Sequence, residues 1–398
     1  MSGNKGAIGE VTSGCRVFGA YKVYVGIKGI VPIIHGPVGC YWSNIFFQLA
    51  HNQGTLRSGT SALHDRDVVF GTENRLRQAI EAAKRYHRSE VIAILGCCVP
   101  ALVGEDTELI RKEEVLDTIF IDATGFKGKE WEGYEEALLS LMPFIKKGER
   151  RKKTVNIFGL DAISPKIRAD MAEIRRLLAR CGFQVNAVPG VGSTFDQVQK
   201  MAEVERNVVF GGCGLKLAET MEDEFGIPYE IVEIPYGFDL TRRFLKQVTG
   251  VNYEENVMEE LKRANAMLHR FYDMPVAVIG DCARVRAMAE FLFNELGCDV
   301  RFTASVSGSP LYPETEDDLF EIERAVQELG DELRLIFGTS FQKRVAHKLG
   351  IPLIRISHPI YDEISLCQHS PYMGYRGMVV LVEKILNLFL NAYPKEDW

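Results

Sequence analysis

The sequence predicts an α/β protein made of three Rossmann-like domains, each with a parallel sheet flanked by helices. Short apolar runs rich in β-branched residues alternate with amphipathic stretches along most of the chain, and this alternation is typical of parallel sheets covered on both faces. Glycine-rich turns follow several of the apolar runs. A basic, polar stretch, Lys146–Lys153, separates the first domain from the rest. We therefore expect domains at residues 1–150, 151–272 and 273–398.

The first two domains contain the clearest periodic segments. In the first domain, Glu73–Tyr86 has apolar residues at helical spacing and Val91–Leu95 is an apolar run of strand length. The strands expected in the second domain are Val155–Gly159, Gln184–Val188 and Asn207–Phe210, and its helices are Lys166–Cys181 and Leu215–Phe225. Gly226-Ile227-Pro228 is expected to end the last helix, because proline cannot continue it.

The third domain repeats the alternation and is expected to close with a C-terminal helix. Its expected strands are Val276–Ile279, Asp299–Ala304, Leu333–Phe337 and Leu353–Ile356, and its expected helices include Ala283–Leu296 and Phe341–Leu349. Ligands of such sheets collect at the carboxyl ends of the strands, so the turns that follow the strands are the first places to search for a site.

The composition excludes several classes of protein. Among 398 residues, 54 acidic side chains outnumber 47 basic ones, for a formal net charge of −7, so no overall positive field is available to bind nucleic acid. Residues 1–10 lack the apolar core of a secretory signal, and no apolar run approaches the ~20 residues that span a bilayer. We therefore expect a cytoplasmic protein that binds neither nucleic acid nor membranes.

The cysteine count and the absence of nucleotide-binding motifs exclude two further kinds of protein. Nine cysteines is an odd number in a large chain, so a disulfide framework is not expected. The sequence has neither a G-x-G-x-x-G after its first strand nor a G-x-x-x-x-G-K-[ST] motif. The chain therefore does not resemble a nucleotide-binding protein, and any ATP-dependent step would need a partner.

Three cysteines lie in turns that contain glycine. Cys15 follows a glycine, Cys40 closes the run His35-Gly36-Pro37-Val38-Gly39-Cys40, and Cys98 follows the predicted strand at residues 91–95. Glycine lets backbone N–H groups approach a sulfur atom, and iron–sulfur clusters are held by thiolates in such turns. Structural zinc sites usually contain C-x₂₋₄-C pairs, which are absent here. The spacing alone leaves an iron–sulfur site and buried structural thiols equally open.

Further short motifs lie in order along the chain, between and after the cysteine turns. They are Asp67–Gly71 with Asn74 and Leu76, Val103–Asp106, Phe225–Tyr229, Leu349–Pro352, Ile356–Asp362 and Gly374–Gly377. With these segments and the cysteine turns in order, the chain resembles the nitrogenase component 1 family along essentially its whole length. That family includes the molybdenum–iron protein subunits, their cofactor-scaffold relatives and other nitrogenase-like reductases.

The resemblance implies a cluster at a subunit interface. Cys15, Cys40 and Cys98 would each ligate an iron–sulfur cluster, either P-cluster-like [8Fe-7S] or [4Fe-4S], shared with a homologous α-type subunit. The separations between the cysteines and the ending at Pro359–Asp362 look like those of the β-type subunit. The implied assembly is an α2β2 heterotetramer. Its electrons would come from an ATP-dependent [4Fe-4S] reductase of the iron-protein kind and pass to an iron-based cofactor in the α-type partner.

The resemblance leaves two functions open. One is an oxidoreductase subunit that reduces nitrogen or cleaves a carbon–sulfur bond, as in a methylthio-alkane reductase-like complex. The other is a scaffold subunit for assembly of an iron–sulfur cofactor, although β-type scaffolds tend to keep fewer of the three cysteines. Gly125 stands in the loop where the family's β-type chain has a serine ligand, and the chain is shorter than typical nitrogenase subunits. Both departures favour a nitrogenase-like reductase over a conventional nitrogenase.

Other candidate residues are interpreted as structural. Cys97 is expected to point away from Cys98 and to pack, and Cys213 is expected to pack a strand-to-helix turn, although it lies near the position of a cofactor cysteine in α-type chains. Core positions are expected for Cys181, Cys282 and Cys298, and structural or interface positions for Cys367, His369 and Trp42.

Two polar positions near the cysteines are interpreted in the same way. His35 is expected to cap its strand and orient the following turn. Glu105 and Asp106 are expected to open the helix after Cys98, where carboxylates interact favourably with the helix dipole.

Overall fold

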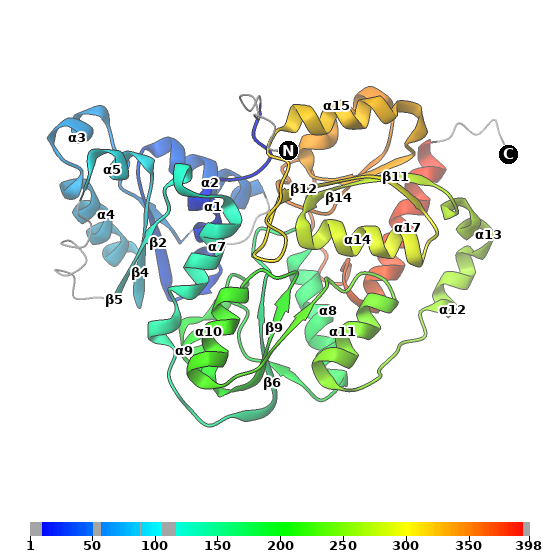
Figure 1. Cartoon of the computed structure of the whole chain (residues 1–398), viewed down its shortest axis with the longest axis horizontal. Helices are drawn as coiled ribbons and strands as arrows, with labels where there is room; N and C mark the ends of the chain where they lie inside the picture. Colours follow the sequence, from blue (N-terminus) through cyan, green and yellow to red (C-terminus); the bar gives the residue numbers. More distant parts are fainter. Residues whose placement is uncertain (1–9, 51–56, 88, 106–116, 393–398) are drawn as a thin grey trace. The chain divides into compact units, whose positions relative to one another are not determined.

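The computed structural model describes residues 10–50, 57–87, 89–105 and 117–392 (Figure 1). The chain separates into two compact units. The N-terminal unit comprises Gly14–Ile163 and Val185–Glu230, and the C-terminal unit comprises Met1–Ser13, Ser164–Gln184 and Ile231–Trp398. The domain ranges expected from the sequence stay a prediction.

The first sheet of the N-terminal unit is parallel and has the strand order β3-β2-β4-β5. Its strands are β2 (Ile30–His35), β3 (Gly59–Thr60), β4 (Val91–Gly96) and β5 (Asp117–Asp122). All residues of β2 and β4 are buried, because alternate side chains face two apolar clusters. Helix α4 (Glu73–Tyr86) covers one face and helix α1 (Arg16–Val25) covers the other (Figure 1).

Two helices of this unit touch at their backbones. Helix α1 packs along α7 (Glu130–Leu139). A Cβ atom at Gly19 would overlap the carbonyl oxygen of Glu130, and a Cβ at Gly133 would overlap that of Arg16. Only glycine allows so close an approach. The contact brings the start of α1 beside the loop that precedes α7, where Cys15 forms an isolated bridge with Lys129.

The other sheets of this unit are built on β6 (Arg151–Phe158) and β9 (Val204–Phe210), which pair in parallel. Their sheet has the order β10-β9-β6-β7, in which β7 (Gln184–Val185) and β10 (Tyr229–Val232) lie where the chain passes between units. Two short strands, β1 (Ile27–Lys28) and β8 (Ser193–Thr194), form a further parallel pair. Helix α10 (Leu215–Phe225) follows β9 and ends at Gly226, as expected from the sequence.

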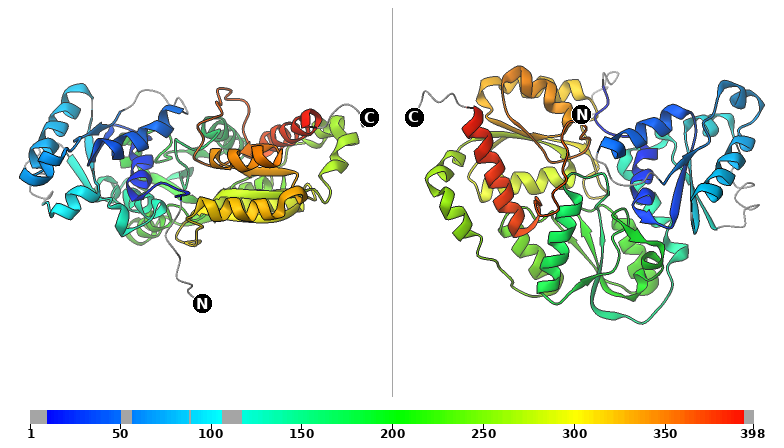
Figure 2. Two further views of the ribbon diagram at one scale, coloured as in Figure 1. Left: turned by 90° about the horizontal axis from the view of Figure 1, so that it is seen from above. Right: turned by 180° about the vertical axis from the view of Figure 1, so that it is seen from behind.

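The C-terminal unit contains one more parallel sheet, of order β12-β11-β13-β14. Its strands are β11 (Pro275–Asp281), β12 (Asp299–Ser307), β13 (Leu335–Gly338) and β14 (Leu353–Arg355). Helices α15 (Leu319–Leu329) and α16 (Lys343–Leu349) cover one face of this sheet, and α14 (Cys282–Asn294) packs on β11 and β12 from the other (Figure 1). Figure 2 shows the long C-terminal helix α17 (Gly374–Ala392) beside α8 (Ile167–Arg180).

The remaining helices are short or peripheral. In the N-terminal unit they are α2 (Val38–Ala50), α3 (Asp65–Phe70), α5 (Cys98–Val103) and α9 (Phe195–Gln199), with 3-10 turns at Gly125–Lys127, Met142–Phe144 and Met201–Glu203. In the C-terminal unit they are α11 (Asp239–Thr249), α12 (Met258–Leu261) and α13 (Asn265–Leu268), with 3-10 turns at Lys262–Ala264, His269–Phe271, Gly330–Glu332 and Ser340–Gln342. No helix in the described residues is long and apolar enough to cross a membrane.

The fold class expected from the sequence is confirmed, with differences at element ends. The helices at residues 73–86 and 215–225 have the expected bounds. The strand expected at residues 184–188 is only Gln184–Val185. The helix expected at residues 341–349 begins with a 3-10 turn, in which the Thr339 hydroxyl accepts a hydrogen bond from the Phe341 N–H.

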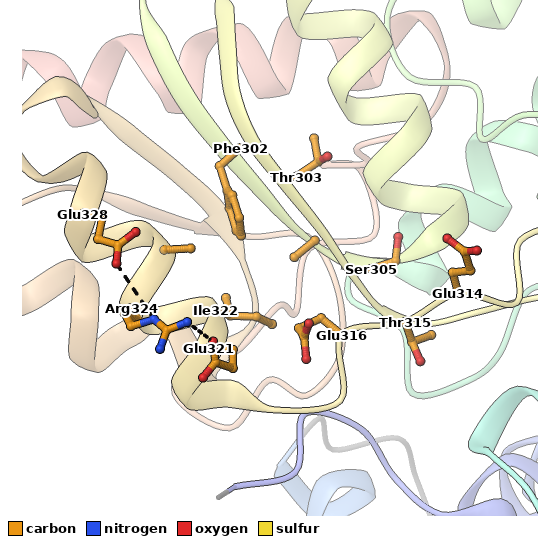
Figure 3. Close-up of a pocket in the computed structure, with 12 residues that line it drawn as sticks. Phe302, Thr303, Ser305, Glu314, Thr315, Glu316, Glu321, Ile322, Arg324 and Glu328 are labelled. Carbon is orange, nitrogen blue, oxygen red and sulfur yellow. Dashed lines mark hydrogen bonds and ion pairs between the residues drawn. The ribbon is translucent and has the colours of Figure 1, made fainter. Parts of the chain in front are cut away.

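A cavity of about 500 Å³ lies beside β12 and α15 in the C-terminal unit (Figure 3). Its apolar lining includes Phe302 and Ile322, and acidic side chains stand around it. Arg324 forms ion pairs with Glu321 and Glu328. Its lining contains no cysteine, so this cavity does not belong to the thiol site predicted from the sequence.

Candidate metal centre

The three predicted cysteines all lie at helix N-termini of the N-terminal unit. Cys15 is the N-cap of α1, Cys40 is in the first turn of α2, and Cys98 is the first residue of α5. Strand β2 leads into α2 and β4 leads into α5, and these strands are neighbours in a parallel sheet. Cys40 and Cys98 therefore come to the same edge of the sheet.

Gly125 lies between Cys15 and Cys98. A Cβ atom at this glycine would stand 3.4 Å from the Cβ of Cys15 and 3.5 Å from the Sγ of Cys98. The Gly125 N–H donates a hydrogen bond to the Cys98 Sγ over 3.3 Å. The loop before α7 thus supplies a backbone donor to one thiol, and a side chain at position 125 would point at both thiols.

Cys97 is a fourth thiol at this edge, which the sequence analysis did not include in the site. A Cβ atom placed on Gly36 would stand 2.7 Å from the Cβ of Cys97 and 3.9 Å from that of Cys40. Cys97 is buried in the apolar core, as expected. A hydrogen bond from its thiol nevertheless lowers the pKa of Cys40 to about 7, although burial acts in the opposite direction.

The thiols lie within electrostatic range of one another. Burial raises the pKa of Cys15, and the charges of Cys40 and Cys98 add to this effect. The Cys40 thiolate likewise keeps the pKa of Cys97 well above its usual value, through their hydrogen bond and together with burial. Gathered thiolates repel one another, and a bound cation removes that repulsion.

The donor set fits a multi-iron cluster better than a single ion. Among the described residues, no three His, Cys, Asp or Glu side chains converge closely enough to hold one metal ion. Soft thiolates from separate elements, with a backbone N–H aimed at sulfur, are the donors that iron–sulfur clusters use. A cluster can contact thiols on several sides, so the arrangement of Cys15, Cys40 and Cys98 suits such a group.

Exposed apolar side chains lie on the elements that carry these thiols. Cys15 is exposed, and Cys40 and Cys98 are half-buried. Large exposed apolar side chains belong to the same helices or the same loop, namely Val38, Trp42, Phe46, Leu102 and Phe126. Clustered exposed apolar residues indicate an interaction surface. The thiols therefore lie where a partner protein could complete their environment.

Glu105 has a buried partner that the sequence did not predict. Helix α5 begins at Cys98 and ends at Val103, so Glu105 follows it, and the helix that Glu105 and Asp106 are expected to open would fall outside the described residues. Its Oε2 atom lies 2.6 Å from the Nε2 atom of His35, and both side chains are buried. His35 ends β2, as expected. Asp106 lies outside the described residues.

A second buried carboxylate, Glu130, holds the start of α1. Its Oε2 atom accepts a hydrogen bond from the Gly14 N–H over 2.8 Å, and its Oε1 atom pairs with the Lys22 Nζ over 2.6 Å. The sequence contains no signal that distinguishes Glu105 or Glu130 from surface carboxylates, because their partners lie far away along the chain.

Cys213 lies at a different and more tightly packed edge. It precedes α10, whose first N–H groups, on Gly214 and Lys216, donate to the Glu135 carboxylate. A Cβ atom on Gly159 would stand 3.0 Å from the Cys213 carbonyl oxygen and would overlap that of Phe210.

Cys213 packs against the core, as expected, and the burial of Cys181, Cys282 and Cys298 also confirms their expected core positions. Cys367 and His369 are exposed. Their expected structural or interface role stays a prediction.

Comparisons with known proteins agree with this architecture. The chain is 25% identical to a subunit of the light-independent protochlorophyllide reductase of Cereibacter sphaeroides, over 92% of this chain and 74% of that protein. It is 25% identical to the nitrogenase iron-molybdenum cofactor biosynthesis protein NifN of a Nostoc species, over 95% and 92%. It is 23% identical to the nitrogenase molybdenum-iron protein beta chain of Methanococcus maripaludis, over 96% and 95%.

A solved structure and a family match cover nearly the whole chain. The structure of nitrogenase Cp1 at pH 6.5 superposes with a TM-score of 0.81 at 19% identity, over 100% of this chain and 97% of the other. This likeness confirms the fold. The sequence pattern of the family described as nitrogenase component 1 type oxidoreductase matches residues 15–390. The chain therefore belongs to the nitrogenase component 1 type oxidoreductase family.

Proposed function

We propose that this chain is the β-type subunit of a nitrogenase-like iron–sulfur oxidoreductase. Cys15, Cys40 and Cys98 would hold an iron–sulfur cluster shared with a homologous α-type subunit. The observation that carries this proposal is the meeting of thiols from separate elements. Cys15 and Cys98 lie beside Gly125, Cys40 lies beside Cys97 at Gly36, and the elements that carry these thiols also bear exposed apolar side chains. When bound, the cluster, [8Fe-7S] or [4Fe-4S], would accept and release single electrons.

The residues of this chain have distinct tasks in the proposal. The three thiolates ligate iron, and the Gly125 N–H stabilises negative charge on the Cys98 sulfur. The apolar side chains of Trp42 and Phe126 would exclude water when the α-type subunit covers them. Burial and hydrogen bonding of the sulfurs then set the reduction potential.

The electron donor is proposed to be a separate ATP-dependent [4Fe-4S] reductase. The chain lacks nucleotide-binding motifs, so ATP hydrolysis would take place on another protein. Val69 and Phe70, on α3, are 74% and 81% exposed, and α3 contacts the Cys98-bearing helix α5. An exposed apolar pair so near the thiols would suit a docking surface for the reductase.

The iron-based cofactor that receives the electrons is proposed to lie in the α-type subunit of an α2β2 assembly. Around Cys213, the Glu135 carboxylate already occupies the start of α10, and backbone atoms crowd Gly159. That edge is therefore tightly packed at the start of α10 and at Gly159. The reacting atoms of the substrate would therefore contact the partner.

The relatives and Gly125 both bear on the substrate class. The relatives at 23–25% identity include a molybdenum-iron protein chain and a protochlorophyllide reductase subunit, so similarity alone does not choose between nitrogen and tetrapyrrole reduction. Gly125 favours a nitrogenase-like reductase, with carbon–sulfur bond cleavage among the candidate reactions. The scaffold alternative is favoured by the similarity to NifN. The retention of all three thiols favours the catalytic role.

Anaerobic purification of the chain with its native partner tests the proposal. Iron and heterometals would be counted, and EPR spectra recorded before and after reduction with dithionite. Iron well above that of one four-iron cluster per heterodimer, with signals from two distinct centres, is the expected result. A complex without iron would overturn the cluster assignment. A single centre whose iron passes to an acceptor apoprotein on mixing would favour the scaffold.

A further inference from the structure

A buried polar network joins the turns that carry Cys40 and Cys98. The His35 ring, at the end of β2, is fully buried. Its Nε2 atom lies 2.6 Å from the Glu105 Oε2 atom, and its Nδ1 atom lies 2.9 Å from the Ser61 Oγ atom. Both ring nitrogens therefore have partners, and these come from segments that follow α5 and β3.

The network also involves the backbone of the Cys40 turn. The Gly36 N–H donates to the Ser61 Oγ atom over 3.0 Å. Burial acts to raise the pKa of Glu105, but the interactions with His35 and Thr72 outweigh it and keep the pKa below its usual value. Glu105 is thus a buried carboxylate at neutral pH, and it depends on its partners for compensation.

His35 holds helix α5 at both ends. The Cys97 N–H donates to the His35 carbonyl oxygen over 3.0 Å, just before the helix begins. The ring of His35 reaches Glu105, just after the helix ends at Val103. A helix of only six residues is not stable by itself. Its position, and that of Cys98, therefore depends on tertiary contacts such as these.

We propose that His35 and Glu105 are positioning residues of the iron–sulfur site. They hold α5 against the turn that carries Cys40, so that Cys40 and Cys98 keep the separation a shared cluster requires. This inference rests on the proposed function, because that function supplies the cluster. The positioning of α5 by His35 and Glu105, however, can be tested in the chain without a cluster.

The test compares Glu105→Ala and Glu105→Gln in the full chain, with Glu173→Gln as a matched control. Glu173 is also buried and ion-paired, with Arg176, but it lies in the C-terminal unit. We expect Glu105→Ala to lower the iron bound per chain severalfold and to shift the EPR signal of the remaining cluster. Glu105→Gln, which keeps an acceptor for the His35 Nε2–H, is expected to retain most of the iron. The control is expected to retain all of it.

Hydrogen exchange of the cluster-free chain supplies a second readout. Peptides that cover residues 33–42 and 96–104 should exchange faster in Glu105→Ala and at the wild-type rate in Glu173→Gln. If Glu105→Ala does not fold, Ser61→Ala, which removes the contacts of the Ser61 hydroxyl with the His35 Nδ1 atom and with the Gly36 backbone, should still give a smaller increase at residues 33–42.

The outcomes separate the two proposals. Unchanged exchange in the Glu105→Ala and Ser61→Ala variants would overturn the positioning role, whatever the iron content. Faster exchange with wild-type iron would overturn it too, because the site would then not need the network. A wild-type complex that contains no iron would instead remove the proposed function, independently of the exchange result.

Discussion

The carboxyl edge of the first sheet in the N-terminal unit differs from that of the sheet built on β6 and β9. Both edges have parallel strands that lead into helices. At the first edge, a Cβ atom on Gly39 would meet nothing within 4 Å, and Gly125 faces two thiols. At the second edge, Glu135 fills the start of α10, and backbone crowds Gly159. The same topology thus gathers several thiols at one edge and places Cys213 beside a tightly packed turn at the other, so topology alone does not create a binding site.

The largest expected effect comes from replacing a cysteine by alanine at each of the two edges. Cys98→Ala should remove most of the iron from the anaerobically purified complex, because it deletes a thiolate ligand. Cys213→Ala should keep wild-type iron and lower the free energy of unfolding by only about 1 kcal/mol, through lost packing. Metal analysis and urea unfolding check both variants. Iron loss in Cys213→Ala would mean that the second edge also takes part in holding iron.

Alanine substitutions of glycine probe the space at each edge. Gly159 has a φ of +91° and lies against the Cys213 carbonyl oxygen, so Gly159→Ala should lower the free energy of unfolding by about 3 kcal/mol. Gly39→Ala, in helix α2, should change it by less than about 1 kcal/mol. Urea unfolding of the cluster-free chain measures both. Equal costs would contradict the contrast between the edges.

The buried carboxyl at the second edge should make stability depend on pH. Burial raises the pKa of Glu135 to about 7, although the N–H groups of Gly214 and Lys216 oppose this. The folded chain then keeps a proton on Glu135 up to a higher pH than the unfolded chain does. The contribution of Glu135 to the free energy of unfolding therefore falls as the pH rises toward 7 and is constant above it. This loss is roughly 3 kcal/mol.

The measurement is thermal unfolding of the wild type and Glu135→Gln between pH 5 and pH 8. As the pH rises, the wild type should lose stability relative to the Glu135→Gln variant. Other buried carboxyls, such as Asp170 with a pKa of about 6, contribute equally to both chains and cancel. A difference that does not change with pH would show that Glu135 does not titrate in this range.

The smallest effect on stability is expected for Gly125→Ser. The new Cβ atom would have ordinary contacts with Cys15 and Cys98, so the free energy of unfolding should change by less than about 1 kcal/mol. The hydroxyl would stand between two thiols, where it could act as an additional ligand when the cluster is oxidised. EPR of the oxidised complex should therefore differ from that of the wild type, whereas identical spectra would show that position 125 does not reach the cluster.

The fold class predicted from the sequence is confirmed and the site at Cys15, Cys40 and Cys98 stays a prediction, whereas the contacts that the sequence missed have a common physical cause. Periodicity located helices such as Glu73–Tyr86, because an amphipathic helix repeats its apolar residues locally. The pairing of Glu105 with His35 and the place of Cys97 beside Cys40 were not foreseen. Both depend on partners distant in the chain, and no local pattern reports them.

The sequence by itself determined the alternation of strands and helices, the glycine turns that carry Cys15, Cys40 and Cys98, and the absence of nucleotide-binding motifs. Only the tertiary structure decided which thiols meet. Strand order put Cys40 beside Cys98, and the backbone contact between α1 and α7 brought Cys15 to Gly125. Helix periodicity and turns arise from interactions between near neighbours in the chain. The site arises from strand pairing and helix packing, which join residues far apart and depend on the whole fold.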